Sequence, residues 1–507
     1  NSIKFVNEYS FLNNPTSNSL TDNINLQNWH NLDPEIDSIP GTSVERAYDE
    51  LLNGLKGKKV IVAVIDTGLD IDHLSLSNNI WINKDEKLNG KDDDKNGYID
   101  DIYGWNYLGT SYNETRDMTR ILRDNQVDNI KYSLVEEEIR KEIKKSNEQL
   151  NILNYYIQIL EFSKGVISEN LNNTKFTIED VNKIKTEDEK LNRAKNIYID
   201  FESIGYTKEY LNEGIEQYND FINYHFNIDF NGRTSNDNIY DINDTDYGDS
   251  NINNIKDSES HSTHVSGIIS GDRNNKKGNK GINNLVEIMA LRAIPNGDEY
   301  DKDVARAIRY AVDNGAKIIN GSFGKYFSSN PEWVIDAIRY ASKKDVLVVA
   351  AAGNESKDLD LLSNDNYPND QFFNKNEFSD TFIKVGASTI NLNENFTAYF
   401  SNYGKINVDI FAPGVDIYSS VPNDKYKFQD GTSMASPVVS GIASLIMSYF
   451  PKLSAKKVKE IILKSGIDID LKIGNLGSNK HFREYSKSGK LINAYNALIL
   501  ASKSKRE

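Results

Sequence analysis

The chain has 507 residues, of which 38% are hydrophobic and 26% are charged, the composition of a globular protein. Its net charge of −16 would repel nucleic acid and anionic membrane surfaces, so we expect neither as a partner. The absence of cysteine excludes disulfide bonds, thiolate metal sites and a cysteine nucleophile. No apolar run approaches the roughly 18 to 20 residues that a membrane span requires. The composition carries no information on the oligomeric state.

The first strand that we expect is KKVIVAVIDTG at 58–68, a continuous apolar run that ends in Asp66. Such a run is typical of a buried parallel strand whose carboxyl end carries functional residues. The residues before the domain, 1–44, lack clear periodicity. We predict that they form an arm laid over the domain.

An acidic stretch, DDDKNGYIDD at 92–101, alternates oxygen-bearing side chains ahead of Gly97, as in the first half of a calcium-binding loop. The twelfth position of such a loop falls on Tyr103, so the usual bidentate glutamate is missing, and Asp100 or Asp101 would have to close the site. We predict a structural calcium ion here, with a plain acidic turn as the alternative. The expected ligands are Asp92, Asp94, Asn96 and Asp100.

Residues 114–226 interrupt the strand pattern, because their apolar residues are spaced as in helices. Thr177 and Asp180 form a pair resembling a capping box ahead of one such run. We predict a helical insertion of two or three antiparallel helices. It either packs only on itself and on the surrounding domain, or contributes to binding a substrate or a partner. The flanking segments 45–113 and 227–507 then form one domain.

Strand and helix alternate again after the insertion. Apolar runs recur at 316–324, 345–354 and 382–388, and segments with helical spacing lie between them at 301–315 and 330–344. This alternation predicts an α/β fold with a doubly wound, mostly parallel sheet. In such folds ligands bind at the carboxyl ends of the strands.

Two further stretches contain residues that could form an acid–base site with Asp66. HSTHVSG contains His261 and His264, three residues apart on one helical face, and the spacing does not choose between them. DGTSMASP places Ser433 among small residues at the start of a helix, with Pro437 expected in the first turn. A serine hydroxyl becomes a nucleophile when a histidine removes its proton and a carboxylate orients that histidine.

With these motifs the chain resembles the subtilisin-like serine peptidases. VIDTG, HSTHVSG, NGSFG, AAAGNE, FAPGVDIYSSVP and GTSMASPVVSGIASL occur in the order of that family. The resemblance covers roughly residues 45–115 and 230–500. It implies the subtilisin-like α/β fold and the activity of a serine endopeptidase that hydrolyses peptide bonds through an acyl-enzyme.

The resemblance also implies a role for individual residues. Asp66 matches the aspartate that orients the base, His261 the general base, and Ser433 the nucleophile. Asn354 matches the amide that donates to the developing oxyanion. A further stretch matches the strand that pairs with extended substrate backbone and borders the principal specificity pocket, namely Ser322, Phe323 and Gly324.

Proteins or peptides are therefore the expected substrates. The expected location is outside the cytoplasm, either secreted or at the cell envelope, after removal of an N-terminal signal segment ahead of Asn1. The alternative from another functional class is a non-catalytic protein-binding module on the same scaffold. The presence of all the triad and oxyanion residues argues against that alternative.

Overall fold

The computed structural model describes residues 26–124, 129–275, 278–371, 376–474, 476 and 480–504. The chain divides into two compact units. One consists of Asn1–Tyr112 and Thr234–Glu507, and the other of Asn113–Arg233. The insertion predicted at 114–226 falls within the second unit. The first part of the predicted arm, before Leu26, lies outside the described residues.

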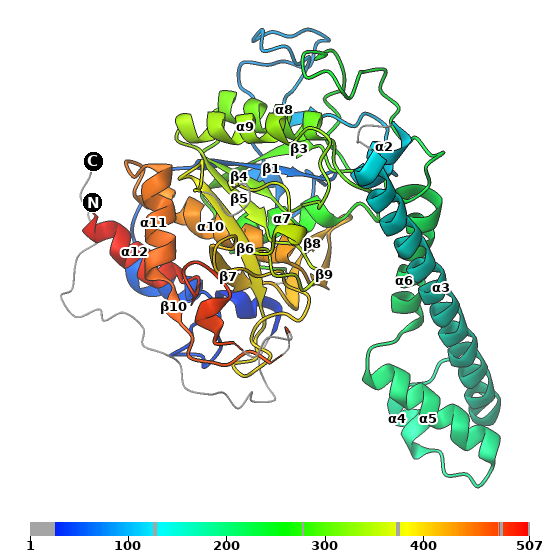
Figure 1. Ribbon diagram of the computed structural model, residues 1–507. Helices are drawn as coiled ribbons and strands as arrows, with labels where there is room; N and C mark the ends of the chain where they lie inside the picture. The colour runs from blue at the N-terminus through cyan, green and yellow to red at the C-terminus, as the bar shows by residue number, and fades with distance from the viewer. Residues whose placement is uncertain are drawn as a thin grey trace. The chain divides into compact units, whose positions relative to one another are not determined.

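A nine-stranded sheet forms the centre of the first unit (Figure 1). In spatial order the described strands are β10 (Ile467–Asp468), β11 (Lys490–Leu491), β7 (Ile410–Pro413), β6 (Phe382–Ser388), β5 (Leu347–Ala351), β4 (Ile318–Gly321), β1 (Val60–Asp66), β3 (Val286–Arg292) and β2 (Gly104–Asn106). The pairings are parallel except for β10 with β11. The predicted α/β fold with a mostly parallel sheet is confirmed.

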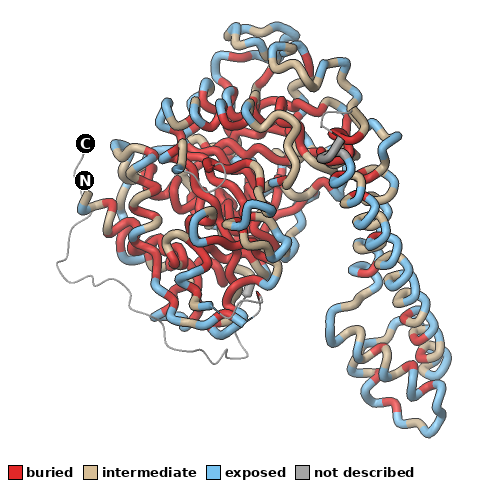
Figure 2. Tube along the Cα trace, in the orientation of Figure 1, coloured by how far each residue is buried: buried red, intermediate tan, exposed pale blue. Residues whose placement is uncertain are grey.

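Helices cover both faces of this sheet, which explains why its strands are apolar on both sides. Val62 and Val64 of β1 pack into one hydrophobic cluster, and Ala63 and Ile65 into another. The first cluster contains side chains from α7 (His261–Ser270), α10 (Thr432–Tyr449), α11 (Ala455–Ser465) and α12 (Ala494–Lys503). The second contains side chains from α8 (Asp301–Asp313) and α9 (Pro331–Lys343). Figure 2 shows the buried residues concentrated between these layers.

A two-stranded antiparallel hairpin lies apart from the main sheet. It consists of β8 (Ile417–Val421) and β9 (Lys425–Gln429). Carbonyl oxygens of β9 accept hydrogen bonds from two buried histidines: His73 Nε2 lies 3.2 Å from Lys425 O, and His264 Nε2 lies 3.0 Å from Lys427 O. Imidazole N–H groups thus satisfy backbone acceptors on β9.

The second unit is helical, as its apolar spacing predicts, but its described residues form five α-helices instead of the predicted two or three. Its helices are α2 (Asp117–Arg123), α3 (Asn129–Leu171), α4 (Ile178–Lys183), α5 (Glu189–Ser203) and α6 (Lys208–Asp220). Thr177 and Asp180 form a capping box at the start of α4. Leu160 and Ile167 of α3 are buried with Leu191 of α5 and Leu211 of α6, which gives the unit a small core of its own.

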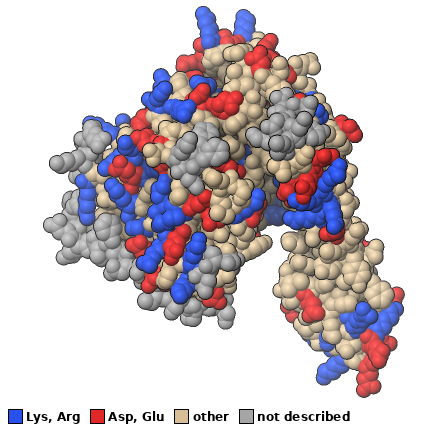
Figure 3. Space-filling model, viewed as in Figure 1, with Lys and Arg blue, Asp and Glu red and all other residues tan. Residues whose placement is uncertain are grey.

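The surface of the molecule carries charges of both signs. On the face shown in Figure 3, Lys and Arg side chains are interspersed with Asp and Glu. Among the described helices, none combines the length and apolarity needed to cross a membrane.

The described part of the N-terminal arm contributes side chains to the core of the first unit. Trp29 is fully buried, and its Nε1 donates to the carbonyl oxygens of Val415 and Asp416 at 3.2 and 3.1 Å. His30 is also buried, and neither of its ring nitrogens has a partner among the described residues. Burial and, to a smaller extent, the charge of Arg273 lower the pKa of His30 to about 3.

His30 should make the protein sensitive to acid. Between about pH 6.5 and pH 3 the unfolded chain binds a proton at His30 that the folded chain does not, so the free energy of unfolding falls as the pH falls, by at most about 1.4 kcal/mol per pH unit. We expect His30→Leu to reduce the difference between urea unfolding midpoints at pH 7 and pH 4.5. The partly exposed His481 provides the control, and an equal reduction in His481→Leu would contradict this account.

Candidate active site

The sequence singles out four stretches of the first unit as candidates for the site. Three of them lie at the ends of strands of the sheet, and the fourth begins a helix next to the sheet. β1 ends in Asp66, β4 leads into Ser322, and β5 leads into Asn354. β1 lies between β3 and β4, and β4 pairs with β5, all in parallel. The carboxyl ends of these strands therefore meet at one edge of the sheet. Ser433 lies in the first turn of α10, which packs against β4, β5 and β6.

Asp66 and His261 form a direct contact at this edge. Asp66 Oδ1 lies 2.7 Å from His261 Nδ1, and the carboxylate is 1% exposed, whereas the imidazole is one-third exposed. Because an ionised carboxylate only accepts hydrogen bonds, Nδ1 carries the proton and Nε2 is left as the acceptor. Burial lowers the pKa of His261, but the charge of Asp66 and the hydrogen bond to it raise it by more, so the pKa lies above its ordinary value.

The neighbouring His264 occupies a different environment. It is fully buried, and its Nε2 lies 3.0 Å from Lys427 O on β9. Burial lowers the pKa of His264 to about 3, so it remains neutral at physiological pH. The structure therefore brings His261, and not His264, to Asp66, which the sequence spacing alone did not decide.

Ser433 presents its hydroxyl to the segment that follows β4. Its Oγ donates to Ser322 O at 3.0 Å, and Ser322 Oγ donates in return to Ser433 O at 2.8 Å. In the described parts of the chain no hydrogen bond joins Ser433 to His261. The sequence predicts Pro437 in the first turn of this helix. α10 begins at Thr432, so Pro437 is instead its sixth residue and lies beyond the first turn. Pro437 lacks the N–H that would otherwise bond to Ser433 O.

Thr432, the residue before Ser433, fixes the side chain of Asn354 through hydrogen bonds. Asn354 Oδ1 accepts from both the backbone N and the Oγ1 of Thr432, at 2.9 and 3.0 Å. Thr432 Oγ1 accepts in turn from Gly353 N at 3.0 Å. With its oxygen occupied in this way, the amide of Asn354 offers its Nδ2 as a donor. The sequence pattern had not singled out Thr432, because a threonine beside a serine carries no signal of this contact.

Gly431 leaves open the space next to two donors. Its φ is +152°, and a Cβ built there would lie 3.6 Å from Asn354 Nδ2 and 3.5 Å from Ser433 N. A side chain at this position would contact the amide of Asn354 and the first turn of α10, and the positive φ would strain its backbone. The absence of a side chain leaves room for a small acceptor atom beside these two N–H groups.

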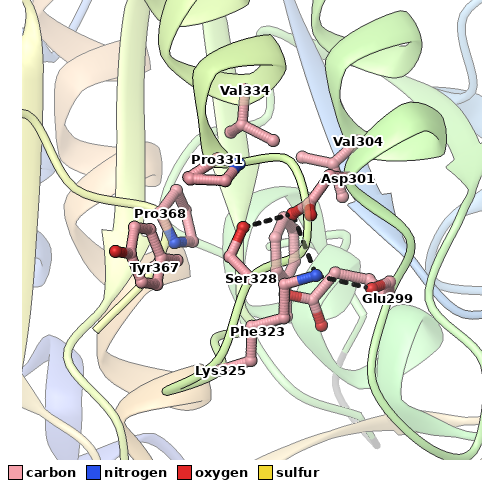
Figure 4. Close-up of a pocket in the computed structure, with 10 residues that line it drawn as sticks. All are labelled: Glu299, Asp301, Val304, Phe323, Lys325, Ser328, Pro331, Val334, Tyr367 and Pro368. Carbon is pink, nitrogen blue, oxygen red and sulfur yellow. Dashed lines mark hydrogen bonds and ion pairs between the residues drawn. The ribbon is translucent and has the colours of Figure 1, made fainter. Parts of the chain in front are cut away.

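The predicted substrate-binding stretch follows β4 without regular structure. Ser322 is buried, Phe323 half-buried and Gly324 exposed. Phe323 lines a small pocket together with the apolar side chains Val304 and Val334 (Figure 4).

The polar end of the same pocket holds a buried ion pair. Lys325 Nζ lies 2.9 Å from Asp301 Oδ1 and donates to Glu299 O at 2.9 Å (Figure 4). Ser328 Oγ donates to Asp301 Oδ1 at 2.9 Å. Burial raises the pKa of Glu299 to about 7, against the opposing charge of Lys325. The pocket beside Phe323 is thus apolar on one side and charged on the other.

The acidic loop brings together some of its predicted ligands. Carboxylate oxygens of Asp92 and Asp94 lie within 4.8 Å of each other and of an oxygen of Glu86. Glu86 is buried and lies six residues ahead of the loop, where no sequence pattern pointed to it. Three converging carboxylates form a donor set that suits a hard cation such as calcium.

The remaining predicted ligands are arranged differently. Asn96 turns its Nδ2 toward carboxylate oxygens of Asp94 and Asp101, at 3.1 and 2.9 Å. Asp100 lies outside the group of three, and its carboxylate accepts from the backbone N of Asn89 and Gly90 at 2.8 and 3.0 Å. Asp101 is buried, and burial raises its pKa. Of the two carboxylates considered for closing the site, Asp101 therefore lies on the side of Asp94 and Asn96.

This fold and the Asp66–His261 contact at its strand ends are those of a subtilisin-like α/β protein. The model of the subtilase family matches residues 57–485, and the chain belongs to that family.

Three relatives illustrate the similarity. The chain is 36% identical over 261 residues to a thermophilic serine proteinase of Bacillus sp. (strain AK1), covering 51% of this chain and 55% of the relative. It is 35% identical over 234 residues to a cell wall-associated protease of Bacillus subtilis (strain 168), covering 46% and 24%. It is 36% identical over 189 residues to thermitase of Thermoactinomyces vulgaris, covering 37% and 61%. The matched regions thus span between about a quarter and three-fifths of these relatives.

Proposed function

We propose that the protein is a serine endopeptidase that hydrolyses peptide bonds of protein or peptide substrates through an acyl-enzyme. The observation that carries this proposal is the 2.7 Å contact between Asp66 and His261 Nδ1, which leaves Nε2 as a proton acceptor at the edge of the sheet. Membership of the subtilase family and the names of the relatives support it.

In the proposed reaction, Ser433 Oγ attacks the carbonyl carbon of the scissile bond and its proton passes to His261 Nε2. The charge of Asp66 stabilises the imidazolium so formed, which agrees with its effect on the pKa of His261. The C–N bond then breaks, and His261 gives the proton to the leaving amine. Water attacks the remaining ester by the same route, releasing the acid and restoring Ser433.

For the attack, the hydroxyl of Ser433 has to leave Ser322 O and turn to His261 Nε2. Hydrogen bonds of this kind often form or tighten only when substrate is bound. During the attack, negative charge grows on the carbonyl oxygen. Asn354 Nδ2 and the N–H of Ser433 are the proposed donors to it, with Thr432 holding the amide in place.

Covalent labelling with a fluorophosphonate, followed by mapping of the modified peptide, tests the proposal directly. We expect a single modified residue, Ser433. Digestion of a mixed peptide library, read by mass spectrometry, should then give the cleavage preference. If neither labelling nor cleavage occurs, the alternative is favoured, a non-catalytic binding module. The observation in favour of that alternative is that the hydroxyl of Ser433 bonds to Ser322 and not to His261.

We also propose that the acidic loop binds calcium, with Glu86, Asp92 and Asp94 as the central ligands. Three close carboxylates repel one another, and a bound cation would neutralise them and stabilise the folded state. We expect a chelator to lower the thermal unfolding midpoint by about 3 °C, the shift that corresponds to about 2.7 kcal/mol of ligand stabilisation in a unit of this size.

The variant Asp92→Asn with Asp94→Asn should lose the response to chelator, whereas Asp241→Asn, in a separate acidic turn, should keep it. Metal analysis of the purified protein distinguishes an ion too tightly bound to strip from no ion at all. Finding no calcium by that analysis would reduce the loop to an acidic turn.

A further proposal is that the helical unit Asn113–Arg233 is not required for hydrolysis of short peptides. On either side of it, residues of the first unit already contact each other: Thr234 N donates to Ser111 Oγ at 2.9 Å, and the hydroxyls of Thr110 and Thr234 lie 3.0 Å apart. We expect a protein with a short glycine-rich link from Tyr112 to Thr234 to fold, with kcat/KM on short peptides within about threefold of the parent. If the shortened protein folds but does not hydrolyse short peptides, the helical unit is required for hydrolysis and this proposal is wrong.

For its location, we propose the cell envelope or the exterior. The name of one relative, the cell wall-associated protease, supports this. Fractionation of the source cells, with detection by a specific antibody, would test it.

A further inference from the structure

A buried amide side chain links β4 to the helix that carries Ser433. Asn320, the third residue of β4, is fully buried. Its Oδ1 accepts from Ser436 Oγ at 3.1 Å and from Ser440 Oγ at 2.8 Å. These serines lie one turn apart on α10, so a single side-chain oxygen ties two successive turns of the helix to the strand.

The nitrogen of the same amide faces the substrate-binding stretch. Asn320 Nδ2 donates to Ser322 Oγ at 3.0 Å, and Ser322 Oγ donates to Ser433 O at 2.8 Å. A hydroxyl has one proton, so the bond accepted from Asn320 leaves that proton free for the carbonyl of Ser433. The network therefore has a fixed direction, from the strand through Ser322 to Ser433.

Pro437 explains why the carbonyl of Ser433 is available. In a regular helix it would accept from the backbone N–H four residues later, but position 437 is proline and has no N–H. Ser322 supplies the missing hydrogen bond from outside the helix. The carbonyl of Ser433 thus accepts from a side chain that Asn320 orients, in place of the backbone N–H that position 437 lacks.

From this geometry we infer that Asn320 is a positioning residue for Ser433. It touches neither the proposed nucleophile's hydroxyl nor the space next to Asn354, and it acts through Ser322. The inference rests on the function proposed above, because the placement of Ser433 affects turnover only if Ser433 is the nucleophile. Reacting groups have to be held within about 0.5 Å of the productive geometry, and a buried, fully bonded network can supply that precision.

Asn320→Ala tests the inference, and the chain offers a matched control. Asn283 is also fully buried, and its Nδ2 donates to Ser444 Oγ at 3.0 Å and Ser448 Oγ at 3.1 Å, again one turn apart on α10. Asn283→Ala removes an equivalent link to the same helix away from Ser433. We expect kcat on a peptide substrate to fall about 10- to 100-fold in Asn320→Ala with KM within about threefold, and to stay near the parental value in Asn283→Ala.

Two further variants separate positioning from a merely structural effect. Ser322→Ala removes the same link at its other end, and we expect it to reproduce the loss of kcat. The double variant of Asn320 and Ser322 should lose no more than either single variant, because both act on one bond to Ser433. In Asn320→Asp the carboxylate would take the proton of Ser322, so kcat should fall although the side chain keeps its size.

The rate of phosphonylation of Ser433 by a small fluorophosphonate provides a second readout, which does not depend on peptide binding. We expect it to fall in parallel with kcat. If Asn320→Ala does not fold, Ser322→Ala and Asn320→Asp carry the test. Equal kcat and labelling rates in the Asn320, Ser322 and Asn283 variants, with the parent labelled at Ser433, would overturn this inference alone. A parent that is not labelled would overturn the proposed function and this inference with it.

Discussion

Ser433→Ala is expected to lower kcat by about 10⁶-fold, the magnitude known for removal of the nucleophilic serine of subtilisin itself. The hydroxyl contributes one hydrogen bond, to Ser322 O, so the free energy of unfolding should fall by only about 0.5 to 1.5 kcal/mol. Activity on a chromogenic peptide and the urea unfolding midpoint are the two measurements. Labelling by a fluorophosphonate should disappear in the variant.

Ser448→Ala is the control for this prediction, because Ser448 is a buried serine of the same helix away from the strand ends. It should keep both activity and labelling. Persistent labelling of Ser433→Ala at another serine would show that the nucleophile had been misassigned. A similar loss of activity in both variants would attribute the effect to the stability of α10.

Asp66→Asn is expected to lower kcat by about 10⁴-fold, the scale of the corresponding substitution in a serine peptidase with a Ser-His-Asp triad. An asparagine can turn its NH₂ toward Nδ1, which makes Nδ1 the acceptor and places the proton on Nε2. The imidazole of His261 then cannot take the proton of Ser433. The isosteric amide keeps the size of this buried side chain, but Asp66 Oδ1 also accepts from Thr67 N at 2.7 Å, and an NH₂ in its place would lose that bond, so the free energy of unfolding in urea should fall by about 0.5 to 1.5 kcal/mol.

The pH profile of the residual activity provides a second test at this position. Protonation of His261 removes the base, so kcat/KM falls as the pH falls through its pKa. In the parent, Asp66 raises that pKa, and the acidic limb should lie above the ordinary histidine value of about 6.5. Asp66→Asn should move the limb to lower pH. An unchanged limb, or an equal loss of kcat in Asp70→Asn four residues along, would contradict the role given to Asp66.

Whether a feature of the fold or of the site could be predicted from the sequence depends on how close together in the chain its residues lie. The buried strand at 58–68, the helices of the insertion and the capping box at Thr177 follow from spacing over a few residues, and the structure agrees with them. The alternation of strands and helices predicted the α/β class. The roles of Asp66, His261 and Ser433 came from the resemblance to a family, since the individual residues carry no such signal.

Other features depend on segments that are distant in the chain. His261 and His264 could not be separated by spacing, because the difference lies in what faces each ring: Asp66 on β1, or a carbonyl of β9 more than 160 residues away. No local motif predicts that the carboxylate of Glu86 lies with those of Asp92 and Asp94. Asp100, which the loop pattern favoured as a ligand, lies outside the group formed by Glu86, Asp92 and Asp94, and its carboxylate accepts from the backbone N of Asn89 and Gly90.

By itself, therefore, the sequence determined the elements, the fold class and the residue types available for catalysis, since periodicity and turn chemistry act between near neighbours. Only the tertiary structure decided which of these residues meet. The register of β1 against β3 and β4, and the packing of α10 on β4, place Asn320 against Ser436 and, through Ser322, hold the backbone of Ser433. The contacts of Asn320 with Ser436 and of Ser322 with Ser433 join groups more than 100 residues apart, and they follow from how strands and helices pack, which no local pattern of residues records.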